Sequence, residues 1–363
     1  MNLVMQRENK LQQQIHIIKN EISSQFQNNL ISIILYGSYG RGEGAFYYDD
    51  SGCIRTYNDF DIIVVLDYLV DIKKVHKIGH LLSEKLDVKW VDISQKTILK
   101  LKTLELNIFN YDLKYGSRVI YGDENVINFI PSFNSKNIHL KEVETLYFTR
   151  MWAFLGCLPY DGFDRKLNSE ETRFFNYQMA KAILAVVDII LIQKKQYCTS
   201  YIARVDRIFK ISKNDVQLIK WSKWAIEEKM SPTNDVISPS ELKEMYKEVL
   251  SLFLFKMYPA LSLYYKININ GAFDVKKGVF RSISELIIFF KVLLKTRKFD
   301  YFKKIKLKLV QSFLVESFLK NKTEKECLLK ESKKILRKLD KSLKVRSLDW
   351  NEMRLIVSKL RAE

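Results

Sequence analysis

The chain is poor in the residues that mark several common classes of protein. Its 363 residues include only 4 Cys, 4 His, 5 Pro and 12 Gly. The histidines have neither triad nor metal-ligand spacing, which argues against histidine-based catalysis. The cysteines, Cys53, Cys157, Cys198 and Cys327, form no Cys-x-x-Cys or Cys/His cluster, which argues against a zinc motif and a disulfide-rich scaffold. We therefore expect reduced thiols and a cytoplasmic location.

Long hydrophobic runs are also missing. Asp188, Lys256 and Lys291 each interrupt one of the most apolar stretches, so none reaches the roughly 18 residues that a membrane span needs. Residues 1–8 lack the basic region followed by an apolar one that is typical of a signal peptide. A hydrophobic content of 47% and 22 Phe indicate a folded globular protein, long enough for two or three domains.

Acidic residues are fewer than basic ones, and most of the excess positive charge lies in the last third of the chain. The chain has 60 Lys and Arg against 42 Asp and Glu, a formal net charge of +18. Residues 271–363 hold 25 Lys and Arg against 11 Asp and Glu, so this basic tail carries +14. Such a tail suits contact with nucleic acid or an anionic membrane surface, but lysine-rich helices are also common solvated faces. Its densest cluster is Lys295, Arg297, Lys298, Lys303, Lys304, Lys306 and Lys308.

The most informative segment is a Gly-Ser turn that follows an apolar strand. Residues 31–36 are mostly Ile and Leu, and Gly37-Ser38 comes directly after them, with Arg41 three residues further on. Small residues let backbone N–H groups approach an anion closely because no Cβ stands in the way. The turn therefore predicts a phosphate-binding site formed by Gly37, Ser38 and Arg41.

A pair of carboxylates begins the next long apolar strand. Asp59 and Asp61 are two residues apart, so on a strand they project from one face. Two converging carboxylates are costly unless a cation lies between them, and oxygen ligands suit Mg²⁺ or Mn²⁺. Asp92, which interrupts the apolar residues of 88–93, is our choice for a third acid, with Asp87 as the alternative. Asp92 would have a purely structural role if it pairs with Lys89.

These motifs together resemble the DNA polymerase β-like nucleotidyltransferase superfamily. Its pattern is an apolar residue, Gly-Ser, a gap, Asp-x-Asp and a later acid on another strand. The resemblance implies a metal-dependent enzyme in which Asp59, Asp61 and Asp92 are the catalytic metal ligands and Gly37, Ser38 and Arg41 contact an NTP. The gap is longer than in compact members because residues 46–56 are interposed, and we expect a hairpin or lid there.

A second constellation lies further along the chain. Lys181 stands among small and apolar residues of a predicted helix, and Cys198-Thr199-Ser200-Tyr201 precedes another helix. This pairing resembles template-independent members of the superfamily, which implies that Lys181, Ser200 and Tyr201 hold the nucleotide. Alternatively, Lys181 pairs with Asp188, and Ser200 is only a helix cap. Further phosphate or acceptor candidates are Arg150, Arg204 and Arg207.

The pattern of elements predicts an α+β protein. We expect a small mixed sheet with helices on one face, built from strands at 31–36, 60–66, 88–93 and 117–121 and helices at 9–28, 72–86 and 95–108. The predicted domains are a nucleotidyltransferase domain at 1–130, a helical domain closing the nucleotide cleft at 138–268 and a basic helical region at 271–363. Helices are predicted at 139–156, 170–195, 198–210, 214–229, 239–266, 281–298 and 301–345.

The expected activity is transfer of an NMP from an NTP to an acceptor, with release of pyrophosphate. The layout resembles enzymes that modify a small hydroxyl compound such as a sugar or an antibiotic, and we favour a small-molecule acceptor. It also resembles toxin- or defence-type enzymes that modify tRNA or a protein. A third interpretation is a non-catalytic module that senses a nucleotide.

Overall fold

The computed structural model describes residues 3–49, 51–159, 161–233, 237–281, 300–340, 343 and 347–362. The chain forms two compact units that interleave along the sequence. The first comprises Met1–His139, Leu191–Lys213 and Ile226–Thr233. The second comprises Leu140–Ile190, Asn214–Ala225 and Asn234–Glu363. The three predicted domain ranges remain predictions.

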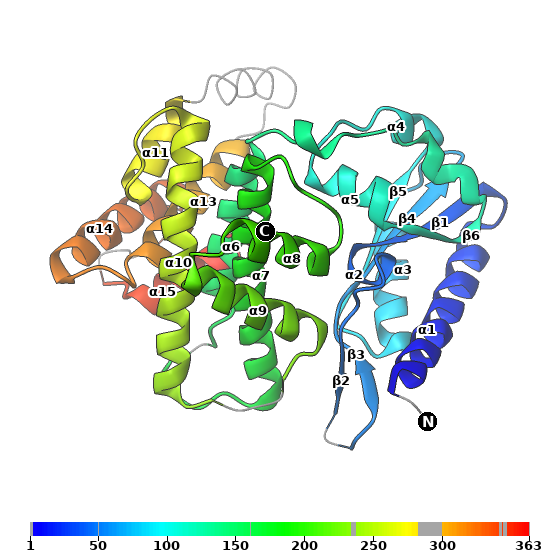
Figure 1. Ribbon diagram of the computed structural model, residues 1–363, viewed down its shortest axis with the longest axis horizontal. Coiled ribbons are helices and arrows are strands. Elements are labelled where there is room, and N and C mark those ends of the chain that lie inside the picture. Colours follow the sequence, from blue (N-terminus) through cyan, green and yellow to red (C-terminus); the bar gives the residue numbers. More distant parts are fainter. Residues whose placement is uncertain are drawn as a thin grey trace. The chain divides into compact units, whose positions relative to one another are not determined.

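The first unit contains a four-stranded mixed sheet (Figure 1). Its strand order is β5-β4-β1-β6, with β1 antiparallel to both β4 and β6 and β4 parallel to β5. The strands are β1 Leu30–Tyr36, β4 Phe60–Leu66, β5 Val91–Lys96 and β6 Arg118–Gly122. The parallel pair is connected through α3, Ile72–Leu86, as parallel neighbours require a crossover. Together with the largely helical remainder, this sheet makes the protein α+β, as predicted.

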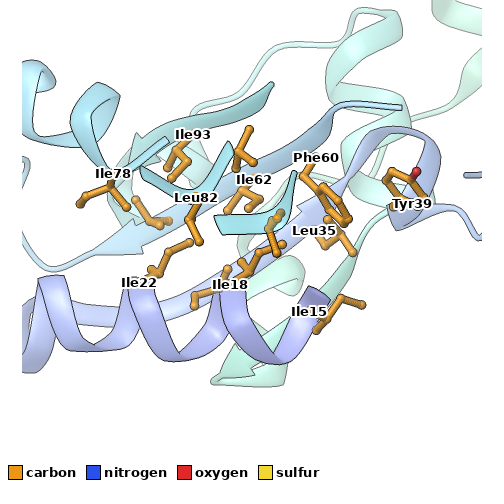
Figure 2. Packing of buried hydrophobic residues seen from close by; sticks show 14 of the residues in the cluster. Ile15, Ile18, Ile22, Leu35, Tyr39, Phe60, Ile62, Ile78, Leu82 and Ile93 are labelled. Carbon is orange, nitrogen blue, oxygen red and sulfur yellow. The ribbon is translucent and has the colours of Figure 1, made fainter. Parts of the chain in front are cut away.

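Helices cover both faces of the sheet, so the prediction of helices on one face is wrong. On one face, α1 (Leu3–Phe26) contributes Ile15, Ile18 and Ile22, and α3 contributes Ile78 and Leu82 (Figure 2). On the other face, Leu101 of α4 (Ile98–Lys102) and Leu113 of α5 (Ile108–Gly116) pack with Ile34, Ile63 and Val65. Successive residues of β1 and β4 are apolar, and a strand that is apolar on both sides must be covered on both.

Two predicted elements near β5 have different bounds. β5 begins at Val91 rather than at residue 88, because α3 ends in a left-handed cap at Asp87 and the Val88 amide bonds to the Ser83 carbonyl at 3.1 Å. The helix predicted at 95–108 is only α4, which ends at Lys102, and α5 begins at Ile108 and continues beyond the predicted range to Gly116. Thr97 and Asn107 each accept a backbone N–H at a helix N-terminus, so each starts a new helix.

The insert between the two predicted motifs is a hairpin, as expected. β2 (Phe46–Tyr48) pairs antiparallel with β3 (Ile54–Thr56). The Asp49 carboxylate accepts hydrogen bonds from Ser51 and from the Cys53 amide, and it pairs with Arg55 at 2.7 Å. These bonds hold its pKa well below the ordinary value. Asp49 therefore closes the hairpin turn.

The described part of the second unit is built from helices. They are α6 Glu142–Gly156, α7 Ser169–Gln193, α9 Val216–Met230, α10 Pro239–Tyr265, α11 Ala272–Arg281, α13 Asp300–Glu316, α14 Lys322–Leu339 and α15 Trp350–Ala362. α7 and α9 each extend into segments of the first unit, and α8 (Tyr201–Ile211) belongs to it. Buried aromatic rings fill the second core, with Phe154 packed edge-on to Tyr246 and Phe253 at 5.5 and 5.4 Å.

The basic tail differs in part from its prediction. The helix expected at 301–345 is broken between α13 and α14, because Asn321 caps the second helix by accepting the Glu324 amide at 3.0 Å. α11 was not among the predicted helices. The predicted helix at 281–298, with Lys295, Arg297 and Lys298, lies outside the described residues apart from Arg281.

Among the described helices, α7 alone is long and apolar enough to cross a membrane, so the expectation that Asp188 keeps this stretch below that length is wrong. Of its most apolar window, 83% is buried inside the protein. Such burial is typical of the central helix of a folded domain, and α7 supplies many of the fully buried aliphatic side chains of the chain.

Candidate active site

Two of the predicted acids lie side by side on the sheet. Asp61 of β4 and Asp92 of β5 are register partners in the parallel pair. Their neighbours Ile62 and Ile93 belong to the core beneath α1 and α3, so both carboxylates project from the opposite face. Asp92 is exposed and Asp61 is half-buried. The sheet therefore brings these acids together at the start of both strands.

The Gly37 turn touches this pair of acids. β1 ends at Tyr36, the register partner of Asp61, and Gly37 follows with a φ of +66°. A Cβ at Gly37 would stand 1.9 Å from Oδ2 of Asp61. Burial raises the pKa of the Tyr36 hydroxyl, and the charges of Asp61 and Asp92 raise it further. The turn, Tyr36 and both acids thus form one site.

Asp59 and Asp87 lie in different local environments. Asp59 precedes β4 by one residue instead of lying in the ladder, because Tyr57 and Asn58 bond to Ala45 beside the hairpin. It is half-buried, two residues from Asp61. Asp87, the alternative third acid, is the exposed left-handed cap of α3 and pairs with Arg55 at 2.7 Å. Asp92 is therefore the acid that β5 places beside Asp61.

Substitution of Gly37 tests this packing. We expect Gly37→Ala to displace Asp61 and to lower any activity that depends on it on the order of 10²-fold, because a misplaced catalytic group costs about that much. Gly52→Ala is the matched control, since Gly52 has a φ of +77° and a Cβ added there would meet nothing within 4 Å. The ratio of the two activities, measured on folded protein, isolates the contact with Asp61. Equal losses would show that only backbone strain matters.

Ser38 is held by a lysine that was not predicted. Ser38 follows Gly37 in the short helix α2, Gly37–Gly40, and its Oγ accepts a hydrogen bond from Nζ of Lys229 at 2.9 Å. Lys229 is only 1% exposed and lies near the end of α9, with its ammonium 5.7 Å from the centre of the Tyr201 ring. A buried ammonium needs polar partners. A positive charge is therefore fixed beside the predicted phosphate-binding residue.

Arg41 belongs to a buried network of charges. Its guanidinium lies 3.2 Å from Glu43 and 3.5 Å from Asp112. Asp112 also accepts from Arg204, at 2.9 Å, and from the Tyr197 hydroxyl, at 3.1 Å. Burial raises the pKa of the Asp112 carboxyl, while Arg204 and Arg41 act in the opposite direction. The network fixes Arg41 next to the Gly37-Ser38 turn.

Ser200 and Tyr201 join the same network at the N-terminus of α8. Ser200 is the N-cap, and its hydroxyl donates to Glu43 at 2.7 Å. Glu43 also accepts the amides of Tyr201 and Ile202, so its carboxylate neutralises the positive end of the helix. The Tyr201 ring lies against Arg41 and Arg204 at 4.8 and 4.6 Å. The interpretation of Ser200 as a cap is confirmed, and its contact with a nucleotide stays a prediction.

Lys181 lies in the second unit. Its ammonium stands over the Tyr177 ring at 4.4 Å, one turn away in α7. Arg150, in α6, belongs to the same unit, whereas Arg207 of α8 is half-buried and donates to the Gln196 carbonyl. A role for Lys181 with the nucleotide stays a prediction.

Sequence reasoning gave no site role to Lys229, Glu43 or Asp112, although Lys229 and Glu43 each had a visible signal. Leu218, Trp221, Ser222 and Ala225 mark the buried face of α9 at intervals of three or four residues. Lys229 continues this spacing, so a lysine was predictable on the buried face. Glu43 is marked by Arg41 two residues before it, with which it pairs, but its partner Ser200 and the Asp112 partner Arg204 lie 157 and 92 residues further along the chain.

The carboxylates of Asp61 and Asp92 are suitable ligands for a divalent cation. Carboxylate oxygens are the ligands that Mg²⁺ prefers, and Asp61 and Asp92 present them on one face. Within the described part of the chain, no three His, Cys, Asp or Glu side chains form a ready metal-binding group. Asp61 and Asp92, with Asp59 close by in sequence, are thus the residues that would hold such an ion.

Comparisons with known proteins give little beyond this geometry. No family model matches the chain. No curated protein sequence matches it. Among solved structures, the chain is similar to spectinomycin adenyltransferase AAD(9) from Enterococcus faecialis, solved with ATP and spectinomycin. The TM-score is 0.41 at 13% identity, over 68% of this chain and 98% of that one. This likeness is too remote to carry an argument about activity.

Proposed function

We propose that this protein is a metal-dependent nucleotidyltransferase that moves an NMP from an NTP to an acceptor hydroxyl or phosphate. One observation carries the proposal: Asp61 and Asp92 are adjacent on one sheet face, and the Asp61 carboxylate packs against Gly37 of the Gly-Ser turn. An anion-binding turn that touches a pair of carboxylates suits chemistry on phosphate groups with a divalent cation.

Each side chain has a role in this proposal. Ser38, with Lys229 bonded to its hydroxyl, and Arg41 offer hydrogen bonds and positive charge to the triphosphate. Asp59, Asp61 and Asp92 would hold Mg²⁺ or Mn²⁺, which when bound supplies charge neutralisation at the α-phosphate. Asp92, the exposed acid, accepts the proton of the attacking hydroxyl. Lys181, Ser200 and Tyr201 remain proposed nucleotide contacts.

The reaction exchanges one bond at phosphorus for another. The acceptor oxygen attacks the α-phosphorus, and the new O–P bond forms as the bond to the β-phosphate oxygen breaks. Pyrophosphate carries away the displaced electron pair. We propose a small molecule such as a sugar or an antibiotic-like compound as the acceptor, with tRNA or a protein as the alternative.

A labelling experiment tests the proposal and separates these acceptors. The protein is incubated with each α-labelled NTP and a cell lysate, with Mg²⁺ or with EDTA. We expect label in the small-molecule fraction, release of pyrophosphate, and loss of both in EDTA. Label in RNA or protein instead would overturn the small-molecule acceptor. Nucleotide binding without pyrophosphate release across all acceptor pools would contradict catalysis and favour nucleotide sensing.

A further inference from the structure

The second unit contains a basic cavity that the proposed reaction does not use. It measures about 530 Å³ and lies where α6, α13 and α15 meet. Its lining residues are Thr145, Phe148, Thr149, Lys303, Lys304, Leu307, Lys308, Gln311, Leu360 and Arg361. All of them belong to the second unit, so the cavity is a feature of that unit alone.

Helical spacing explains why these residues share one cavity. Lys304, Leu307, Lys308 and Gln311 follow one another at intervals of three, one and three residues, which places them on one side of α13. Thr145, Phe148 and Thr149 form the matching stripe on α6. Leu360 and Arg361, in the last turn of α15, complete the lining.

The charged side chains among the described lining residues are all cationic. Lys303, Lys304, Lys308 and Arg361 contribute four cationic groups, and no Asp or Glu is among the described residues that line the cavity. Two of the four cations are positioned by aromatic rings. The Lys308 ammonium lies 5.2 Å from the centre of the Phe148 ring. The Arg361 guanidinium lies 4.2 Å from the centre of the Trp152 ring. Like charges gathered around a concave space repel one another and favour a bound anion.

The remaining residues indicate the size and kind of the anion. Phe148 and Leu307, each 4% exposed, form an apolar floor, and the Thr145 and Thr149 hydroxyls and the Gln311 amide add short polar groups. A nucleic-acid backbone or a membrane needs an extended basic surface. A hollow with four cations, hydroxyls and an apolar floor suits a compact ligand instead.

We propose that this cavity binds a phosphorylated small molecule that carries at least two phosphate charges and an apolar or aromatic body. The site is separate from the proposed catalytic residues, and it does not require that the nucleotidyl transfer take place. Phosphate groups would bind Lys304, Lys308 and Arg361, and the body of the ligand would rest on Phe148 and Leu307.

Calorimetric titration with tripolyphosphate and with ATP tests the proposal. Both are titrated into the full chain in low-salt buffer with EDTA, which removes metal-dependent binding. We expect one tripolyphosphate site, for which ATP competes. The double variant Lys304→Gln, Lys308→Gln should weaken binding at least about tenfold, which is a loss of about 1.4 kcal/mol. The double variant Lys306→Gln, Lys320→Gln is the matched control, because it removes two charges from the same region and neither lysine lines the cavity.

Several outcomes would overturn the proposal. The first is that the chain does not bind tripolyphosphate, and the second is that both double variants lose the same affinity for it. The third is that RNA or anionic vesicles displace tripolyphosphate and bind both double variants equally well. The Asp61→Asn protein keeps the cavity intact, so it should bind tripolyphosphate like the parent. A failure of the cavity proposal and a failure of the proposed catalysis therefore give different results.

Discussion

Asp61→Asn is expected to reduce nucleotidyl transfer on the order of 10³-fold or more, a barrier increase of about 4 kcal/mol. Asp61 is the half-buried acid that packs against Gly37 and lies next to Asp92, so its charge sits at the centre of the site. Asparagine keeps the shape of the side chain but removes the negative charge that would bind a divalent cation and balance the surrounding cations. Initial rates with the labelled NTP, measured over a range of Mg²⁺ concentrations, provide the measurement.

A control substitution at the other end of β4 distinguishes an effect on folding from an effect on catalysis. Asp67 directly follows β4 and is exposed, so Asp67→Asn makes the same chemical change away from the site. We expect its activity to stay close to that of the parent, and the unfolding free energy of both variants to change by less than about 1 kcal/mol. Full activity in Asp61→Asn would refute the assigned role. A matched loss in Asp67→Asn would mean that the assay reports overall folding.

The central part of this site was predictable because it is built from local patterns. An apolar run ending in Gly37-Ser38 and an Asp two residues into the next long strand determine both the element types and the faces of their side chains. The face from which Asp92 projects follows from its position between Val91 and Ile93, whereas its register beside Asp61 depends on the pairing of β4 with β5. The coverage of both faces was predictable from the continuous apolar runs of β1 and β4 but was not inferred.

The surroundings of the site were not predictable, because they depend on contacts that are distant in sequence. Glu43 meets Ser200, and Lys229 meets Ser38, across 157 and 191 residues. No periodicity relates such residues, and a Glu in a loop or a Lys near a helix end usually faces solvent. The helix starts at Asn107 and Asn321 were missed for another reason, since a single capping residue outweighs an apolar spacing that continues past it.

Arg204→Met should cost the first unit about 3–5 kcal/mol of stability. Arg204 is 1% exposed and donates to the Cys198 and Thr199 carbonyls, at 2.5 and 2.9 Å, and to Asp112. Methionine matches much of its volume but donates nothing, so two buried carbonyls lose a hydrogen bond and Asp112 keeps only Tyr197 and Arg41 of the partners named above. Urea unfolding, followed by a probe in the first unit, gives the change in free energy.

The matched control is Arg207→Met, one turn further along α8. Arg207 is half-buried rather than buried and donates to one carbonyl, that of Gln196, so its replacement should change stability by only about 0.5 kcal/mol. If the two substitutions lowered the free energy of unfolding equally, the buried contacts of Arg204 would contribute no more to stability than the single bond of Arg207. If Arg204→Met also lowers transfer in protein that is still folded at the assay temperature, we expect the loss to act through Asp112 and Tyr201, which both contact Arg41. Restoration of the rate by added guanidinium would then identify the missing charge, rather than a shifted helix, as the cause.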